Sequence, residues 1–173
     1  DEGGLIVDGH TLGVLMTSDE AAPAPGDWHG LKLFGQTMDS TLLGLTVEYA
    51  GGGASNESGI YVYNATVAMD SCVVRDCLGR GLYAAYGSIL TVTNTELSGN
   101  DEVGLQMATS GDLVGFSGNT VTNNGAGALI LNPGELELLD SSSVLVPNDD
   151  EVIFVSNGTI SQDTTWRDLG ARY

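Results

Sequence analysis

The chain has 173 residues, with 23 acidic against 5 basic side chains and a formal net charge of −18. Nucleic acid is therefore excluded as a partner, because phosphate binding needs clustered lysine and arginine, and docking on an anionic membrane surface is disfavoured for the same reason. Yet 42% of the residues are hydrophobic, which is too many for a disordered acidic tail, and no apolar run approaches the roughly 20 residues needed to insert into a membrane.

A repeat runs along the chain, marked by a small residue followed by an aliphatic one. The markers are Gly30-Leu31, Gly59-Ile60, Gly81-Leu82, Gly104-Leu105, Ala128-Leu129 and Val152-Ile153. From position 81 to 104, 128 and 152 they are 23, 24 and 24 residues apart. Apolar residues within each unit alternate with period two, and no unit has room for a helix of about ten residues. Units of this kind predict the coils of a parallel β-helix, which must stack to bury their apolar faces.

Each predicted coil has three short strands, whose inward side chains should form three stacks. The first strands contribute Val67 and Met69, Leu90 and Val92, and Val114 and Phe116. The second strands contribute Val74, Leu97, Val121 and Leu145. The third strands contribute Leu31 and Leu33, Ile60 and Val62, Leu82 and Ala84, Leu105 and Met107, Leu129 and Leu131, and Ile153 and Val155. We therefore predict an all-β solenoid of about six coils, with a rod about 29 Å long at about 4.8 Å per coil.

One corner of the coil is predicted to carry an asparagine ladder. Asn100, Asn124 and Asn148 recur at the same place in successive units, where Cys77 and Ala50 stand in earlier coils. Asparagine tolerates the left-handed backbone of a sharp bend, and stacked asparagine side chains hydrogen-bond along the axis. Cys77 and the other cysteine, Cys72, are expected to be small buried hydrophobes, because two cysteines make neither a disulfide framework nor a metal site.

Two phrases of the repeat are distinctive, Thr93-Asn94-Thr95-Glu96-Leu97-Ser98-Gly99-Asn100 and Gly118-Asn119-Thr120-Val121-Thr122-Asn123-Asn124. They resemble right-handed parallel β-helix proteins of the pectate-lyase-like superfamily, over roughly residues 40 to 156. Upstream, Gly4–Gly9, Pro25–Leu31 and Val47–Gly51 are similar to a pattern in large secreted bacterial β-helix proteins. The resemblance implies a right-handed coil but no single activity, because this superfamily includes lyases, hydrolases, adhesins and structural stalks.

The organisation follows from the extent of the repeat. We predict one β-helix domain at residues 1–156, with projecting loops at 17–30 and 50–58. Residues 157–173 are expected to form a C-terminal tail or the start of a further repeat unit, since Gly158–Trp166 resembles the opening of such a unit. The chain thus looks like a segment of a longer repetitive protein.

Charged outward residues on the second strands are the candidates for catalysis. Arg75 is expected between Glu48 and Glu96 of the adjacent coils. Resemblance to lyases and hydrolases of the superfamily implies that such a group could act as acid and base. The alternative is a cross-strand ion pair at the surface, worth under about 1 kcal/mol, and this interpretation is preferred.

The outward residues of the third strands are the candidates for binding. They include Tyr61, Tyr63, Tyr83, Ile130 and Phe154, an apolar column that is uncommon on a water-soluble surface. Such a column could form a protein interface or stack on the sugar rings of a carbohydrate, with the protein preferred. Flanking loops that simply cover it are the structural alternative.

The run Asp149-Asp150-Glu151 could hold a calcium ion, although a solvated acidic surface is the default interpretation. No other cofactor is expected.

Together these features favour a non-enzymatic β-helix module with a structural or binding role, placed outside the cell or on its surface. A polysaccharide-active enzyme (lyase or hydrolase) or a carbohydrate-binding β-helix is the alternative. Self-association is expected through the ends of the rod or through the face of Tyr61 and Tyr83, because open ends expose unpaired backbone groups.

Overall fold

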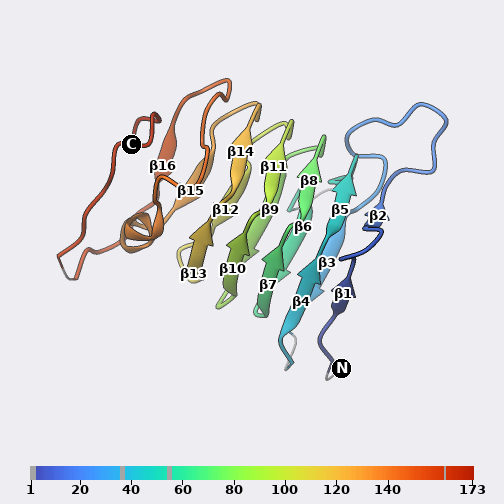
Figure 1. Ribbon diagram of the computed structural model, residues 1–173, viewed down its shortest axis with the longest axis horizontal. Helices are drawn as coiled ribbons and strands as arrows, with labels where there is room; N and C mark the ends of the chain where they lie inside the picture. Colours follow the sequence, from blue (N-terminus) through green and yellow to red (C-terminus); the bar gives the residue numbers. More distant parts are fainter. Residues whose placement is uncertain (1–2, 36–37, 54–55, 162) are drawn as a thin grey trace.

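The computed structural model describes residues 3–35, 38–53, 56–161 and 163–173, which form a rod of stacked coils (Figure 1). Each coil contributes one strand to each of three sheets, and every strand pairs in parallel with its equivalents in the neighbouring coils. Among the described residues, two sheets have five strands and the third has six. The fold is the predicted right-handed parallel β-helix, with about five full turns and a third-sheet strand beyond them.

The strands of each sheet follow one another along the rod. The first sheet consists of β1 (Ile6–Asp8), β4 (Ser40–Leu43), β7 (Thr66–Asp70), β10 (Ile89–Thr93) and β13 (Asp112–Ser117). The second consists of β2 (Val14–Met16), β5 (Leu45–Glu48), β8 (Val73–Arg75), β11 (Glu96–Ser98) and β14 (Thr120–Thr122). The third consists of β3 (Leu31–Phe34), β6 (Ser58–Tyr63), β9 (Arg80–Ala85), β12 (Leu105–Met107), β15 (Leu129–Leu131) and β16 (Ile153–Val155). The 3-10 helix η1 (Pro133–Leu138) packs beside β13.

The core is a set of aliphatic stacks along the axis of the rod. Leu82 of β9 aligns with Leu105, then Leu129, then Ile153 in successive strands, and all four are fully buried. This register confirms that the small-aliphatic markers are successive rungs. The small member of the marker has a steric reason, because the ideal Cβ position of Gly104 lies 2.3 Å from Cγ1 of Val121.

One of the predicted inward positions is wrong, and a second is inward but remains exposed. Val114 is 56% exposed and its neighbour Leu113 is buried instead, because the register between β10 and β13 shifts by one residue after Leu90. A β-bulge of this kind places an extra residue on one strand and turns its side chain outward. Val155 aligns with Leu131 as expected but is 36% exposed, since it lies in the last strand of the sheet.

At most corners of the coil, the residue directly after the strand has a left-handed backbone conformation. After β5, β8, β11 and β14 of the second sheet these residues are Tyr49, Asp76, Gly99 and Asn123. Asn100 and Asn124 come one residue later and do not have positive φ, so the predicted left-handed conformation of the ladder asparagines is wrong. Their role is hydrogen bonding alone.

The asparagine ladder itself is confirmed. Asn100 Nδ2 donates to Asn124 Oδ1 at 3.0 Å, and Asn124 Nδ2 donates to Asn148 Oδ1 at 2.9 Å. Cys77 continues the column, because its backbone N–H donates to Asn100 Oδ1. A second ladder, at the corner between the first and second sheets, joins Cys72 to Thr95 in the same way. Buried polar groups of this kind are stable only because each has a partner.

Candidate functional site

The outer face of the third sheet carries aromatic side chains in two adjacent columns. In the first column the register aligns Lys32, Tyr61, Tyr83, Gln106, Ile130 and Phe154. In the second, Phe34 aligns with Tyr63. Because strands are spaced at about 4.8 Å, aligned rings on neighbouring strands must touch.

Five rings make a continuous cluster, which we call the aromatic face: Phe34, Tyr61, Tyr63, Tyr83 and Tyr86. Tyr61 lies at its centre, with ring centroids 5.4 Å from Phe34, 6.2 Å from Tyr63 and 5.3 Å from Tyr83. Tyr63 also contacts Phe34 at 5.7 Å and Tyr86 at 4.9 Å. All these separations fall in the range in which aromatic pairs attract each other.

Exposure is uneven across the aromatic face. Tyr61 is only 4% exposed, so its predicted place among exposed binding residues is wrong: the neighbouring rings cover it, and burial raises the pKa of its hydroxyl. Phe34 and Tyr86 stand out at 54% and 62% exposed, and Tyr63 and Tyr83 are half-buried. The aromatic face therefore has two exposed rings, Phe34 and Tyr86, packed against three rings that are more buried.

The aromatic face is shorter than the predicted column. Gln106 follows Tyr83, so no ring continues the cluster toward Ile130, which is half-buried, and Phe154, which is exposed. Two residues of the face were missed by sequence reasoning. Phe34 could have been found, since it alternates with Lys32 in the same strand, whereas Tyr86 lies in a turn that strand periodicity does not reach.

Tyr86 has a left-handed backbone conformation, which a bulky side chain seldom adopts. Its φ of 51° lies in the left-handed region, and the equivalent corners of the two preceding coils carry Gly35 and Asn64. Glycine and asparagine suit this conformation, whereas a bulky side chain there costs about 1–2 kcal/mol. An exposed tyrosine is therefore kept at a position where the fold itself favours a smaller residue.

Two cations lie at the aromatic face. The guanidinium carbon of Arg80 is 5.0 Å from the centre of the Tyr83 ring, which is cation–π geometry. Arg80 also pairs with Glu102 at 3.1 Å and donates a hydrogen bond to Gln106. Lys32 is exposed and aligned with Tyr61, and no ion pair to it occurs in the described part of the chain.

The second sheet places the catalytic candidates differently from the prediction. Arg75 aligns with Glu48 on one side and with Ser98, not Glu96, on the other. Its Nε and Nη2 both donate to Glu48 Oε2, at 2.9 and 2.7 Å, and Thr17 Oγ1 donates to the other oxygen of Glu48. Glu96 instead accepts a hydrogen bond from Ser98.

This group has the character of a structural ion pair. Glu48 is buried, and the hydrogen bonds that Arg75 donates to it raise the pKa of Arg75. The nearby Asp76 is itself partly buried, and this burial raises the pKa of its carboxyl group. Both carboxylate oxygens of Glu48 are engaged, so neither is directed to an open cleft. The group ties the loop that contains Thr17 to the second sheet.

The predicted calcium candidates Asp149, Asp150 and Glu151 are all exposed. Across residues 3–35, 38–53, 56–161 and 163–173, no group of three or more His, Cys, Asp or Glu side chains is arranged to hold a metal ion. Calcium binding at this run therefore stays a prediction from sequence.

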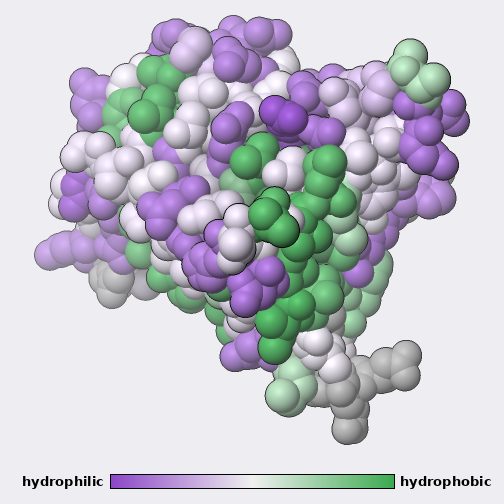
Figure 2. All heavy atoms as spheres, turned by 45° about the vertical axis from the view of Figure 1, so that its right-hand side comes forward, coloured by the Kyte–Doolittle hydropathy of each residue, from purple (hydrophilic) through white to green (hydrophobic). Residues whose placement is uncertain are grey.

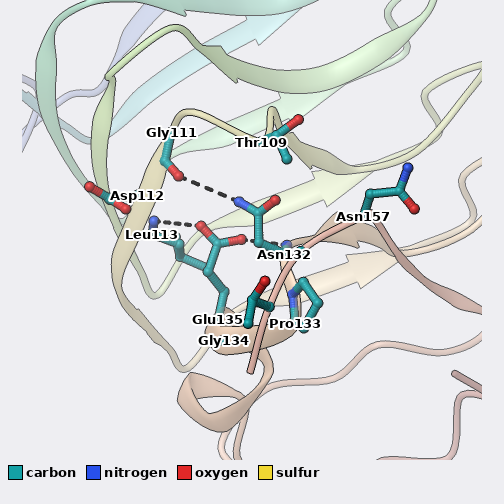
Figure 3. Close-up of a pocket in the computed structure, with 11 residues that line it drawn as sticks. Thr109, Gly111, Asp112, Leu113, Asn132, Pro133, Gly134, Glu135 and Asn157 are labelled. Carbon is teal, nitrogen blue, oxygen red and sulfur yellow. Dashed lines mark hydrogen bonds between the residues drawn. The ribbon is translucent and has the colours of Figure 1, made fainter. Parts of the chain in front are cut away.

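A polar pocket of about 360 Å³ lies between β13, η1 and residues 157–159 (Figure 3). Glu135 is buried in its wall, and its carboxylate accepts hydrogen bonds from the backbone N–H of Leu113 at 2.9 Å and of Asn132 at 2.7 Å. Asn132 donates to the carbonyl of Gly111. Burial raises the pKa of Glu135. These contacts fasten η1 to the first sheet, which is a structural task.

The two cysteines are buried, as predicted, and both are free thiols. Burial raises the pKa of the Cys77 thiol to about 12, which keeps it protonated and unreactive at neutral pH. Within the described ranges, no helix is long and apolar enough to cross a bilayer.

Comparison with known proteins agrees with the architecture. A family model described as "Right handed beta helix region" matches residues 28–162. This match spans most of the chain, and the chain therefore belongs to the right-handed β-helix family. Neither a curated protein nor a solved structure gave a match.

Proposed function

We propose that this β-helix is a non-enzymatic, extracellular or cell-surface binding module, and that the aromatic face is where it holds a protein partner. The observation that carries the proposal is the pair of exposed rings, Phe34 and Tyr86, resting on three further rings. Tyrosine and arginine dominate the residues that contribute most to protein–protein binding, and such residues cluster in packed patches.

The backbone of Tyr86 supports a binding role. At this left-handed corner the two preceding coils carry glycine and asparagine, which suit the conformation better than tyrosine does. Strained conformations persist where a side chain serves a function. The contact between Tyr86 and Tyr63 contributes little stability, because most of the Tyr86 side chain remains exposed to solvent.

Charge indicates which kind of partner fits. Lys32 and Arg80, two of only 5 basic residues in a chain of net charge −18, both lie at the aromatic face. Opposite charges across an interface steer association and select partners. The partner is therefore a protein segment that combines apolar side chains with an acidic group. The acidic composition supports an exported protein, because like charge maintains solubility.

Selection of a displayed random-peptide library on the immobilised chain tests this proposal. We expect the selected peptides to combine carboxylates with apolar residues, and to bind at least about tenfold more weakly to the Phe34→Ala and Tyr86→Asn variants. Tyr86→Asn should leave the thermal stability unchanged or higher, since asparagine suits the left-handed backbone. Trp166→Ala is the matched control, because Trp166 is also an exposed aromatic, at 40%, and lies outside the face.

A glycan array and an assay for unsaturated sugar products complete the test. Glycan binding that Phe34→Ala and Tyr86→Asn abolish would replace the protein partner with a carbohydrate. Release of unsaturated sugar would overturn the non-enzymatic proposal. Peptide binding that is indifferent to both variants would show that the aromatic face is not the binding surface.

A further inference from the structure

The polar pocket beside η1 is built by three successive corners of the coil, where the chain leaves the third sheet. Thr109 and Gly111 follow β12, residues 132–135 follow β15, and residues 157–159 follow β16. After β13 the place of the next first-sheet strand is taken by η1, which packs against β13 and forms one wall of the pocket (Figure 3). The chain therefore bounds the pocket on both sides along the rod.

The pocket is acidic. Glu135 and Asp112 contribute carboxyl groups, and none of the described residues that line it is basic. No ion pair to either carboxylate is formed within the described ranges. A pocket of this kind repels anions and attracts cations. Apolar side chains gather on the side of the rod that carries β1 and β2, which Figure 2 turns forward, so the pocket is separate from that surface.

Glu135 is buried without a counter-charge in the described part of the chain. It is only 8% exposed, and its two oxygens accept hydrogen bonds from the backbone N–H groups of Leu113 and Asn132, which are neutral donors. A carboxylate has about four lone-pair positions, so each oxygen can accept one further hydrogen bond. Burial of an unpaired carboxylate is costly, and this burial raises the pKa of Glu135. A positively charged donor would remove that cost.

The lining of the pocket indicates which kind of cation fits. Thr109, Asn157 and Thr159 are exposed lining residues whose hydroxyl and amide oxygens accept N–H donors. A calcium ion needs six to eight oxygens at about 2.3–2.6 Å, and no group of three or more metal-binding side chains is arranged in this way among the described residues. The volume of about 360 Å³ is instead that of a small organic ligand. An ammonium group supplies three N–H donors and one positive charge.

We propose that this pocket binds a primary alkylammonium group, supplied by a small free amine or by a lysine side chain of another protein. The ammonium donates a hydrogen bond to Glu135 and to neutral oxygens at the rim, while Asp112 adds electrostatic attraction. The alkyl chain lies against Pro133, which is an apolar part of the lining. The site is distinct from the aromatic face, so neither proposal depends on the other.

Titration of the isotope-labelled chain with n-butylamine, followed by NMR, tests the site. The titration is made at about pH 8, where a glutamate is normally ionised and an alkylamine is protonated, in about 0.15 M sodium chloride to screen the net charge. The backbone N–H signals of Leu113 and Asn132, which donate to Glu135, should shift and saturate with a dissociation constant of about 1 mM or below. No saturable shift up to about 20 mM would refute the proposal.

Matched probes separate the chemistry of the ligand. Butan-1-ol has the same shape without the charge, and tetramethylammonium has the charge without an N–H donor, so both should bind at least about tenfold more weakly than n-butylamine. Equal binding of either probe, or a larger shift of the same signals with calcium chloride, would overturn the assignment to an ammonium group. Tighter binding of 1,4-diaminobutane than of a capped tripeptide with lysine between two glycines would assign the group to a free amine, and the reverse order to a protein lysine.

Two substitutions locate the ligand. Glu135→Gln should weaken n-butylamine binding at least about tenfold, because it removes the buried charge. Asp112→Asn should weaken it about threefold, and the exposure of Asp112 means that folding is not at risk. Asp101→Asn is the matched control, since Asp101 is also exposed but does not line the pocket. If Asp101→Asn weakens binding as much as Asp112→Asn, or if both pocket variants bind like the parent chain, the amine is not held in this pocket.

Discussion

The buried asparagines show how single side chains hold the coils in register. Asn124 accepts hydrogen bonds from the backbone N–H and the side chain of Asn100, and it donates to Asn148 and to the carbonyl of Leu97. One residue thus satisfies polar groups in two neighbouring coils. The residue before it, Asn123, takes the left-handed conformation that turns the chain.

Replacing Asn124 by alanine should lower the free energy of unfolding by about 2–4 kcal/mol, because several buried polar groups would lose their partner at once. Chemical denaturation monitored by circular dichroism measures this change. Thr120→Ala is the control, since Thr120 is exposed on the same coil and its substitution should cost under about 0.5 kcal/mol. Equal losses in the two variants would contradict the ladder's role.

Glu135 makes a pH-dependent contribution to stability. Burial raises its pKa in the folded state above that in the unfolded state, so the folded state binds the proton more tightly. Its contribution is therefore fully present below the ordinary pKa of a glutamate, and it declines as the pH rises through the folded pKa.

The Glu135→Gln variant isolates this contribution. The difference in unfolding free energy between the parent and the variant should shift against the parent as the pH is raised from about 4 to about 7. Glu151→Gln, at an exposed position, serves as the control for the loss of one carboxylate. A flat difference for Glu135→Gln would mean that its carboxyl titrates normally.

At the scale of the strand, the small residue of each marker permits one coil to close on its neighbours. The ideal Cβ of Gly59 would lie 2.4 Å from Cγ1 of Val74, and that of Gly104 would lie 2.3 Å from Cγ1 of Val121. A contact this short requires the neighbouring side chain to move. The small residue therefore recurs because a larger side chain would not fit where the second sheet meets the third.

Gly104→Ala should lower the free energy of unfolding by about 1–3 kcal/mol, because it overpacks a filled core. Val121→Ala in the same chain should recover part of that loss by vacating the space, so the two changes should be non-additive in a double-mutant cycle. Gly134→Ala is the control, since no atom lies within 4 Å of its ideal Cβ. Strict additivity would contradict the steric explanation.

The whole molecule carries a large net charge of −18. In the described part of the chain, three ion pairs are formed. Exposed ion pairs contribute little, and the excess of like charge opposes the compact state. Packing along the rod must outweigh this repulsion.

The midpoint of thermal unfolding should therefore rise between about 0.01 M and about 0.5 M sodium chloride, as the Debye length shortens. Calorimetry at constant protein concentration measures the rise. Neutralising Asp149, Asp150 and Glu151 to their amides should raise the midpoint at low salt and reduce the response to salt. A midpoint independent of salt would show that repulsion is unimportant.

The binding candidates were only partly accessible from sequence. Strand periodicity identified Tyr61, Tyr63 and Tyr83 as outward residues of one sheet, and the register aligns Tyr61 with Tyr83 and Tyr63 with Phe34. It could not reveal that Tyr61 is covered or that Tyr86 joins the cluster, because burial of an outward ring depends on neighbours in other coils and in turns. For the same reason the placement of Arg75 beside Ser98 required the register itself.

The sequence by itself determined the coil, because alternation with period two and a recurring small residue are local constraints that every unit must satisfy. It also determined the asparagine ladder, since identical residues at equal spacing must stack. Only the tertiary structure decided which outward side chains are exposed and where a bulge moves Val114 out of the core. These properties depend on contacts between coils, and no single repeat contains that information.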